Sequence, residues 1–280
     1  MILNEDNYYS LEADLEYCSA SQFLDLVGRP LIPGCEARVM AKLRGEYEQE
    51  ITKAMLIGSI LDALWEGADS EELVKRFPDC VSSRGATKGQ IKSEYQQAIQ
   101  LYQRTLKDET FVRYMSGEHQ PIFTCEIEGL KFKSKLDSYH PGKAIVDLKT
   151  TKNVDVDFRY FIPDSGERLP FFYAWNYDVQ LSLYREAVRQ TTGELCTCYI
   201  CAVDKNPHPK VCIIEFEDEV LDKALDYIKR NCERIIRLKS GEIEPIRCEH
   251  DGCDYCRDTY VATVMTTSEF EAHDIEKGAV

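Results

Sequence analysis

Two short stretches of the sequence place carboxylates near an amine in a way that suits a bound cation. Asp147 and Lys149 are two positions apart in a stretch expected to be a strand, so they lie on the same face of it. Asp137 precedes Asp147 by ten residues and one turn, so a hairpin would bring the two carboxylates side by side. Adjacent carboxylates repel each other unless a divalent cation lies between them, and such hard oxygen ligands suit Mg²⁺ or Mn²⁺.

The amine of Lys149 has several chemical uses beside a cation. It can hold or deprotonate a water molecule, or neutralise the negative charge that develops on a phosphate. The structural alternative is a solvated hairpin in which Lys149 forms a salt bridge with an aspartate. From these residues alone, both interpretations stay open.

Two further patterns lie on expected helices. Asp62 follows Gly58 by one turn among apolar residues, and a carboxylate in such surroundings needs a cation or hydrogen-bond donors. The glycine would allow another element to pack closely there. Gln180 and Tyr184 are also one turn apart, so together they can contact a phosphate or a base. The alternative for that pair is an ordinary amphipathic helix.

Twelve cysteines is a high count for 280 residues, and three of them lie in a polar segment. Cys248, Cys253 and Cys256 fall within nine residues, beside charged side chains and around a turn at Gly252. This spacing is typical of a knuckle that binds a metal or an iron–sulfur cluster. Most other cysteines are isolated or lie in apolar stretches, so they are expected to be buried thiols.

The elements that must position these residues form an α/β core with a helical N-terminal extension. The predicted helices cover 19–28, 35–44, 50–66, 70–77, 88–107, 171–190 and 218–239. The predicted strands cover 121–127, 131–139, 144–149, 195–204 and 210–217, and the first three form a meander. Residues 1–110 are a helical region packed on the core, 111–240 are the core, and 241–280 are a Cys-rich segment and tail. All three are expected to form one compact domain.

Composition limits the class of protein. The 34 Lys and Arg against 49 Asp and Glu leave a net charge of −15, which excludes a protein that coats nucleic acid with a basic surface. A protein that meets nucleic acid through bound metal and a local basic strip remains allowed. The lysines expected in that strip are Lys131, Lys133, Lys135, Lys143, Lys149 and Lys152.

No membrane location is expected from the sequence. The longest uninterrupted apolar run covers the six residues 198–203, far below the ~18 that a membrane span needs. Residues 1–10 lack the basic and apolar pattern of a signal peptide. We therefore expect a cytoplasmic protein without disulfides.

The residues singled out first occur in a fixed order along the chain: Gly58-x-x-x-Asp62, Asp137, Asp147-x-Lys149 and Gln180-x-x-x-Tyr184. This set resembles the motifs of the RecB-type PD-(D/E)XK nucleases, and most of all the phage exonucleases related to RecE and phage lambda exonuclease. The likeness extends from about residue 19 to residue 257. It implies a restriction-endonuclease-like α-β-β-β-α-β core around a central mixed sheet.

The resemblance implies a role for each residue. Asp137, Asp147 and the backbone carbonyl of Leu148 would bind the catalytic Mg²⁺ or Mn²⁺, and Lys149 would position the attacking water. The Gln–Tyr pair would support the DNA-facing side of the site. Many RecB-type nucleases have a histidine ligand where this chain has Asp62, so the metal would meet a harder ligand at that position.

Some RecB-type nucleases also hold a [4Fe–4S] cluster with one cysteine ahead of the core and three after it. The cysteines that match this arrangement are Cys35, Cys248, Cys253 and Cys256. Such a cluster would tie the N-terminal helices to the C-terminal segment. Cys18 is a rival for the first ligand, His250 keeps a Zn²⁺ site open, and free thiols are a further alternative.

The resemblance implies a metal-dependent deoxyribonuclease, specifically an exonuclease that resects linear duplex DNA in phage-type recombination. It would use in-line attack of metal-activated water on phosphodiesters, in the cytoplasm of a bacterial host. The partners implied are duplex ends and a single-strand annealing protein, and homo-oligomers occur in this group. One alternative is an endonuclease or CRISPR-adaptation-like nuclease on the same core. The other is a catalytically silent DNA-binding module.

Overall fold

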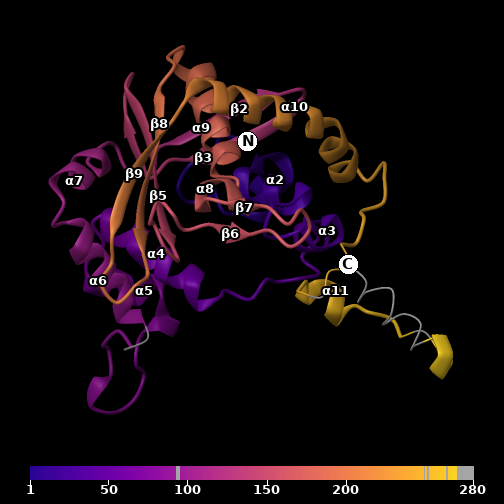
Figure 1. Ribbon diagram of the computed structural model, residues 1–280, viewed down its shortest axis with the longest axis horizontal. Coiled ribbons are helices and arrows are strands. Elements are labelled where there is room, and N and C mark those ends of the chain that lie inside the picture. Colours follow the sequence, from indigo (N-terminus) through magenta and orange to yellow (C-terminus); the bar gives the residue numbers. More distant parts are fainter. Residues whose placement is uncertain (93–94, 249, 251, 263, 270–280) are drawn as a thin grey trace.

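The computed structural model describes residues 1–92, 95–248, 250, 252–262 and 264–269 (Figure 1). Residues 93–94 of the helix expected at 88–107 lie outside this description, as do residues 249, 251, 263 and 270–280 of the C-terminal segment. Across the described part of the chain, no helix combines the length and apolar character needed to cross a membrane.

Four strands form the central sheet in the order β4-β5-β8-β9. Their bounds are Ser138–His140 (β4), Ala144–Thr151 (β5), Thr197–Asp204 (β8) and Val211–Phe216 (β9). The inner pair, β5 and β8, is parallel, and both outer pairs are antiparallel, so the sheet is mixed as expected. Asp147 lies on this inner pair, opposite Ile200.

Different helices cover the two faces of the central sheet (Figure 1). The helices concerned are α4 (Lys53–Trp65), α6 (Gln96–Thr105), α7 (Glu109–Met115), α9 (Tyr177–Thr192) and α10 (Asp218–Lys239). Val146 and Leu148 of β5 pack with α4, α6 and α7, whereas Ile145 packs with α9 and α10. Because side chains alternate along a strand, Asp147 and Lys149 share the face of Ile145 and point toward α9.

A second, three-stranded sheet has the order β1-β3-β2. Its strands are β1 (Cys18–Ser19), β2 (Ile122–Ile127) and β3 (Leu130–Lys135). The β2–β3 hairpin turns at Glu128 and Gly129, whose φ angles of 47° and 80° are those of a type I′ turn.

The expected three-stranded meander is therefore wrong in one respect, because its strands are divided between two sheets. The strand predicted at 131–139 is interrupted at Leu136 and Asp137, between β3 and β4. At this break the Asp137 carboxylate accepts the backbone N–H of Leu148 at 2.7 Å, in place of a backbone partner. Asp137 is thus not paired within a strand, and its carboxylate lies beside β5 instead.

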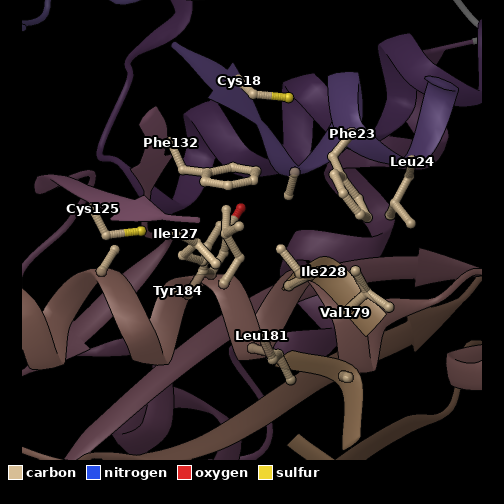
Figure 2. Packing of buried hydrophobic residues seen from close by; sticks show 14 of the residues in the cluster. Cys18, Phe23, Leu24, Cys125, Ile127, Phe132, Val179, Leu181, Tyr184 and Ile228 are labelled. Carbon is tan, nitrogen blue, oxygen red and sulfur yellow. The ribbon is translucent and has the colours of Figure 1, made fainter. Parts of the chain in front are cut away.

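The N-terminal helices pack directly against the core. They are α1 (Leu11–Glu16), α2 (Ala20–Val27), α3 (Glu36–Leu43) and α5 (Ser70–Arg76). The hydroxyl of Ser19 caps the start of α2, and Gly28, with φ 93°, follows its last residue. Figure 2 shows Phe23 of α2 beside Phe132 of β3, above α9 and α10.

Other predicted elements differ in extent. The helix expected at 88–107 begins only at Gln96, because an isolated bridge pairs Val81 with Ile91 across glycine-containing turns. The helix expected at 171–190 breaks at Asn176, whose φ of 53° ends α8 (Phe171–Ala174) before α9 begins. Gly58 is not needed for close packing, since a Cβ there would meet Thr150 Oγ1 at an ordinary 3.8 Å.

The remaining elements are short. They are 3₁₀ turns at Pro78–Cys80 and Gly85–Thr87, the β6–β7 hairpin (Tyr160–Phe161 and Arg168–Leu169) and α11 (Asp254–Asp258). The sequence did not predict α1, α7 or the β6–β7 hairpin, because each is too short to show a clear hydrophobic period.

Candidate active site

Asp147 lies at the centre of the site, buried at 2% exposure. Its Oδ1 atom accepts a hydrogen bond from Nε2 of Gln180 at 2.9 Å. Its Oδ2 atom is 2.5 Å from Nζ of Lys149, but within the described residues it has no hydrogen bond of normal geometry. Asp147 therefore presents one fixed oxygen and one oxygen that a cation could bind.

Asp137 faces the same point from the break between β3 and β4. Leu148 N–H fixes its Oδ2 atom, and Gln120 Nε2 lies 3.4 Å from its Oδ1 atom. The ring of His119 contacts the backbone carbonyl of Asp137 at 3.0 Å. Gln120 has a left-handed φ of 57°, and this strained backbone directs its side chain to Asp137.

Asp62 reaches the site from α4, which packs on the other face of the central sheet from α9. It is half-buried, and no hydrogen bond or ion pair to its carboxylate is found in the described residues. Burial raises the pKa of Asp62 well above its usual value, and the charges of Asp137 and Asp147 raise it further. Burial also raises the pKa of Asp137, and raises that of Asp147 to about 7, against the opposing effect of Lys149.

Lys149 is protonated in this arrangement. Burial alone would lower its pKa, but the charges of Asp147 and Asp137 outweigh burial and raise the pKa above its usual value. The ammonium group also lies 5.0 Å from the centre of the Tyr177 ring. It can therefore donate hydrogen bonds and neutralise charge, and it is a poor general base.

Gln180 and Tyr184 occupy one face of α9, as their spacing predicts. Nε2 of Gln180 contacts both Asp147 Oδ1 and the Tyr184 hydroxyl, the latter at 2.6 Å. Burial raises the pKa of Tyr184 well above its usual value, so its hydroxyl stays protonated. The pair holds Asp147 in one orientation, and the amphipathic alternative does not account for these contacts.

Sequence reasoning missed Tyr177, Gln120 and His119. Tyr177 lies one turn before Gln180 on α9, and a search for helical neighbours of the Gln–Tyr pair could have found it. Gln120 and His119 carry no such signal, because a left-handed turn before β2 positions them.

A cavity of about 1410 Å³ opens onto these residues. Asp62, Asp137, Gln180 and Tyr184 line it, together with parts of the N-terminal segment, α2, α3 and α4. Asp147 is not in the lining, and its burial places it behind the wall. A substrate in the cavity would therefore meet Asp62 and Asp137 first.

The residues of this site fit a divalent cation. Three carboxylates converge, each with its pKa raised, and one buried oxygen of Asp147 has no normal hydrogen bond. An oxygen-rich site of this kind suits Mg²⁺ or Mn²⁺. Asp62, Asp137 and Asp147 are the side chains that would hold the ion, and a role for the Leu148 carbonyl stays a prediction.

A second cluster of ligands lies at the start of α3. The Sγ atoms of Cys35, Cys248, Cys253 and Cys256 all lie within 4.8 Å of one another. Cys18 lies elsewhere, in the main hydrophobic core, and Nδ1 of His250 accepts the backbone N–H of Gly252. The four cysteines could hold a metal, and they join segments more than 200 residues apart.

The comparisons with known proteins agree with this geometry. Residues 19–259 match the family model of a PDDEXK-like domain of unknown function (DUF3799). The chain belongs to this family. No curated protein matches the sequence.

Solved structures give a close likeness. The crystal structure of a "Putative exonuclease" from Eubacterium rectale is 38% identical, with a TM-score of 0.88 over 97% of this chain and 98% of that one. A protein described as SSO0001 is 12% identical over 68% of this chain and 89% of that one. Its TM-score of 0.27 is too low to show a shared fold. The expected PD-(D/E)XK core with a helical N-terminal part is confirmed, and these findings support a nuclease.

Proposed function

We propose that this protein is a Mg²⁺- or Mn²⁺-dependent exonuclease that degrades linear duplex DNA from its ends. The observation that carries the proposal is the convergence of Asp62, Asp137 and Asp147 on the ammonium of Lys149, on a PDDEXK-like core. The likeness to a protein described as a "Putative exonuclease" supports attack at an end over internal cleavage.

The side chains divide the chemistry among them. A divalent ion, when bound, supplies positive charge for the phosphate and makes water more acidic. Lys149 donates hydrogen bonds to the water or to the phosphate oxygens, and its charge opposes the negative charge of the transition state. Gln180 keeps Asp147 Oδ1 engaged, so that Oδ2 remains available. Tyr177 holds the ammonium in place.

The finer parts of the proposal rest on resemblance. They are a role in phage-type recombination, a single-strand annealing partner, oligomerisation and a bacterial cytoplasmic location. The catalytically silent alternative is disfavoured because Asp137, Asp147 and Lys149 are all present and in mutual contact range.

Digestion of labelled DNA tests the proposal. Linear duplex labelled at either the 5′ or the 3′ end, and the same DNA as a closed circle, are incubated with Mg²⁺, Mn²⁺ or EDTA. We expect digestion of linear DNA only, with a metal present, and a loss of at least about 10³-fold in Asp147→Asn. Asp164→Asn, an exposed aspartate on the β6–β7 hairpin, is the matched control.

Two results would contradict parts of this proposal. Cleavage of the closed circle would replace the exonuclease with an endonuclease. Undiminished digestion by Asp147→Asn would show that the active site does not lie at these residues.

For the cysteine cluster we propose a single tetrahedral ion such as Zn²⁺. With metal–sulfur bonds of about 2.3 Å, four thiolates around one ion stand about 3.8 Å apart. Cys35 and Cys248 lie 3.6 and 3.8 Å from Cys256, measured between Sγ atoms, and all four Sγ atoms lie within 4.8 Å of one another. A [4Fe–4S] cluster is larger than a single ion, so the thiolates around it would stand farther apart. Anaerobic protein that is brown and contains iron and sulfide would favour the cluster instead.

A further inference from the structure

An aromatic side chain lies exposed at the edge of the candidate active site. Tyr9 is 73% exposed, although it lines the same cavity as Asp62 and Asp137. At the edge of a cavity, an exposed tyrosine offers a large apolar ring face and a polar hydroxyl that a ligand can cover.

Tyr9 is held in place by its neighbours. Its ring meets the ring of Tyr8 edge-to-face, with centroids 4.9 Å apart. Tyr8 is buried, and the buried Lys133 donates to its carbonyl while lying 4.7 Å from the centre of its ring. Lys133 also pairs with Asp14 at 2.7 Å, so the segment that carries Tyr9 is fastened to β3.

A cation accompanies the exposed ring. Nζ of Lys135 lies 5.4 Å from the centre of the Tyr9 ring, and Lys135 is two residues before Asp137. Lys42 also lines the cavity. Neither lysine has a carboxylate partner among the described residues, whereas the cavity's Arg29 is paired with Asp25.

The cavity is large enough for several nucleotides of a single strand. At about 300 Å³ per nucleotide, 1410 Å³ holds roughly four or five nucleotides of a single strand. Proteins that bind single strands combine a basic groove with aromatic rings on which bases stack.

We propose that Tyr9 stacks on a base of a single DNA strand that enters this cavity, while Lys135 binds the neighbouring phosphate. This inference rests on the proposed nuclease function, because it concerns the strand that reaches the same site. Tyr9 is a positioning residue: it sets which phosphodiester lies beside Asp137, and it takes no part in bond breaking.

Abasic DNA tests the stacking contact directly. Affinities are measured by fluorescence anisotropy for a labelled 12-nucleotide single strand, with Ca²⁺ replacing Mg²⁺ to slow cleavage. Four further strands carry one abasic position each, at the first to fourth nucleotide from the end. We expect one abasic position to weaken wild-type binding by about 5- to 150-fold.

The variants distinguish stacking from packing. For the intact strand, Tyr9→Leu should lose as much affinity as wild type loses through the abasic position. For the abasic strand, Tyr9→Leu should bind as tightly as wild type does. Tyr9→Phe should behave as wild type with every strand. Tyr260→Ala, which removes a 64% exposed tyrosine outside the cavity, is the matched control. Thermal unfolding of each variant shows whether the fold is kept.

Several outcomes would overturn the inference. They are wild-type binding that is insensitive to all four abasic positions, additive losses for Tyr9→Leu and the abasic strand, and no binding of any strand. Digestion by the wild-type protein with Mg²⁺ is scored separately. If wild-type protein digests DNA but Tyr9→Leu binds DNA as wild type does, the stacking role alone is refuted. If the losses from Tyr9→Leu and from the abasic position are not additive but wild-type protein does not digest DNA, the proposed nuclease function alone is refuted.

Discussion

At the scale of single residues, the Asp62 carboxylate lacks, in the part of the chain that the structure describes, the hydrogen-bond donors that its two neighbouring carboxylates have. Asp147 has Lys149 and Gln180, and Asp137 has a backbone N–H, but no such partner of Asp62 is found among the described residues. Its pKa is raised by burial first and by Asp137 second. Asp62 is thus the carboxylate of the site whose charged form has the least support from hydrogen bonds.

Asp62→Asn should make the metal-free protein more stable. An unfolded aspartate has a pKa of about 3.9, and folding raises that of Asp62, so the folded state binds this proton more tightly. The free energy of unfolding therefore falls as the pH rises from about 3.9 through the raised pKa. In EDTA at pH 8 the variant should melt several degrees higher than wild type, with a flatter pH dependence.

The same variant tests whether Asp62 binds the metal. Added Mn²⁺ should raise the melting temperature of wild-type protein, and it should do so much less in Asp62→Asn. Asp164→Asn should match wild type in both measurements. If the variant melts no higher than wild type in EDTA at pH 8, the pKa of Asp62 is not raised as described.

At the scale of elements, the sequence predicted long periodic segments well and short ones poorly. Helix α10 has the bounds predicted for it, 218–239, because its apolar residues recur at helical spacing over six turns. The break at Leu136 and Asp137 had no such signal, because a side-chain bond from Asp137 to Leu148 replaces a backbone bond there. Local pattern does not report contacts of that kind.

The same limit applies to the candidate site. Asp147, Lys149, Gln180 and Tyr184 could be placed from sequence because period-two and period-four spacing fixes the direction of side chains on β5 and α9. Gln120 and His119 could not be placed in this way, because a left-handed turn positions them. The contact between Lys133 and the N-terminal segment was also out of reach, since the two lie more than 100 residues apart.

The cysteine cluster gives a prediction at this scale, since it fastens the C-terminal segment with α11 to the start of α3. If the cluster holds a metal as proposed, Cys253→Ser should lose it, and the segment after α10 should become sensitive to limited proteolysis. Nuclease activity should change little, because the candidate active site lies on β5, α4 and α9. Cys212→Ser, at a half-buried thiol of β9, should keep the metal and resist the protease. Unchanged metal content in Cys253→Ser would show that the ion is held elsewhere.

At the scale of the whole molecule, the net charge of −15 limits how DNA can be held. The expected basic strip is smaller than its lysines suggested. Lys131 pairs with Glu16 at 3.0 Å, Lys133 with Asp14 at 2.7 Å, and Lys149 with Asp147. The N-terminal segment thus neutralises part of the strip, so that few cations near the site remain for phosphates.

Binding to DNA should therefore depend on divalent metal and only weakly on salt. Each phosphate neutralised by a lysine contributes about −0.7 to the slope of log K against log salt for a single strand. With Lys42 and Lys135 as the contacts, anisotropy in Ca²⁺ should give a slope of about −1 to −2, and EDTA should abolish most binding. Lys42→Gln should reduce the slope by about 0.7, whereas Lys223→Gln, an exposed lysine of α10 already paired with Glu219, should leave it unchanged. Tight binding in EDTA with a much steeper slope would place the main DNA contact on another surface, because a metal-centred site cannot hold DNA without its metal.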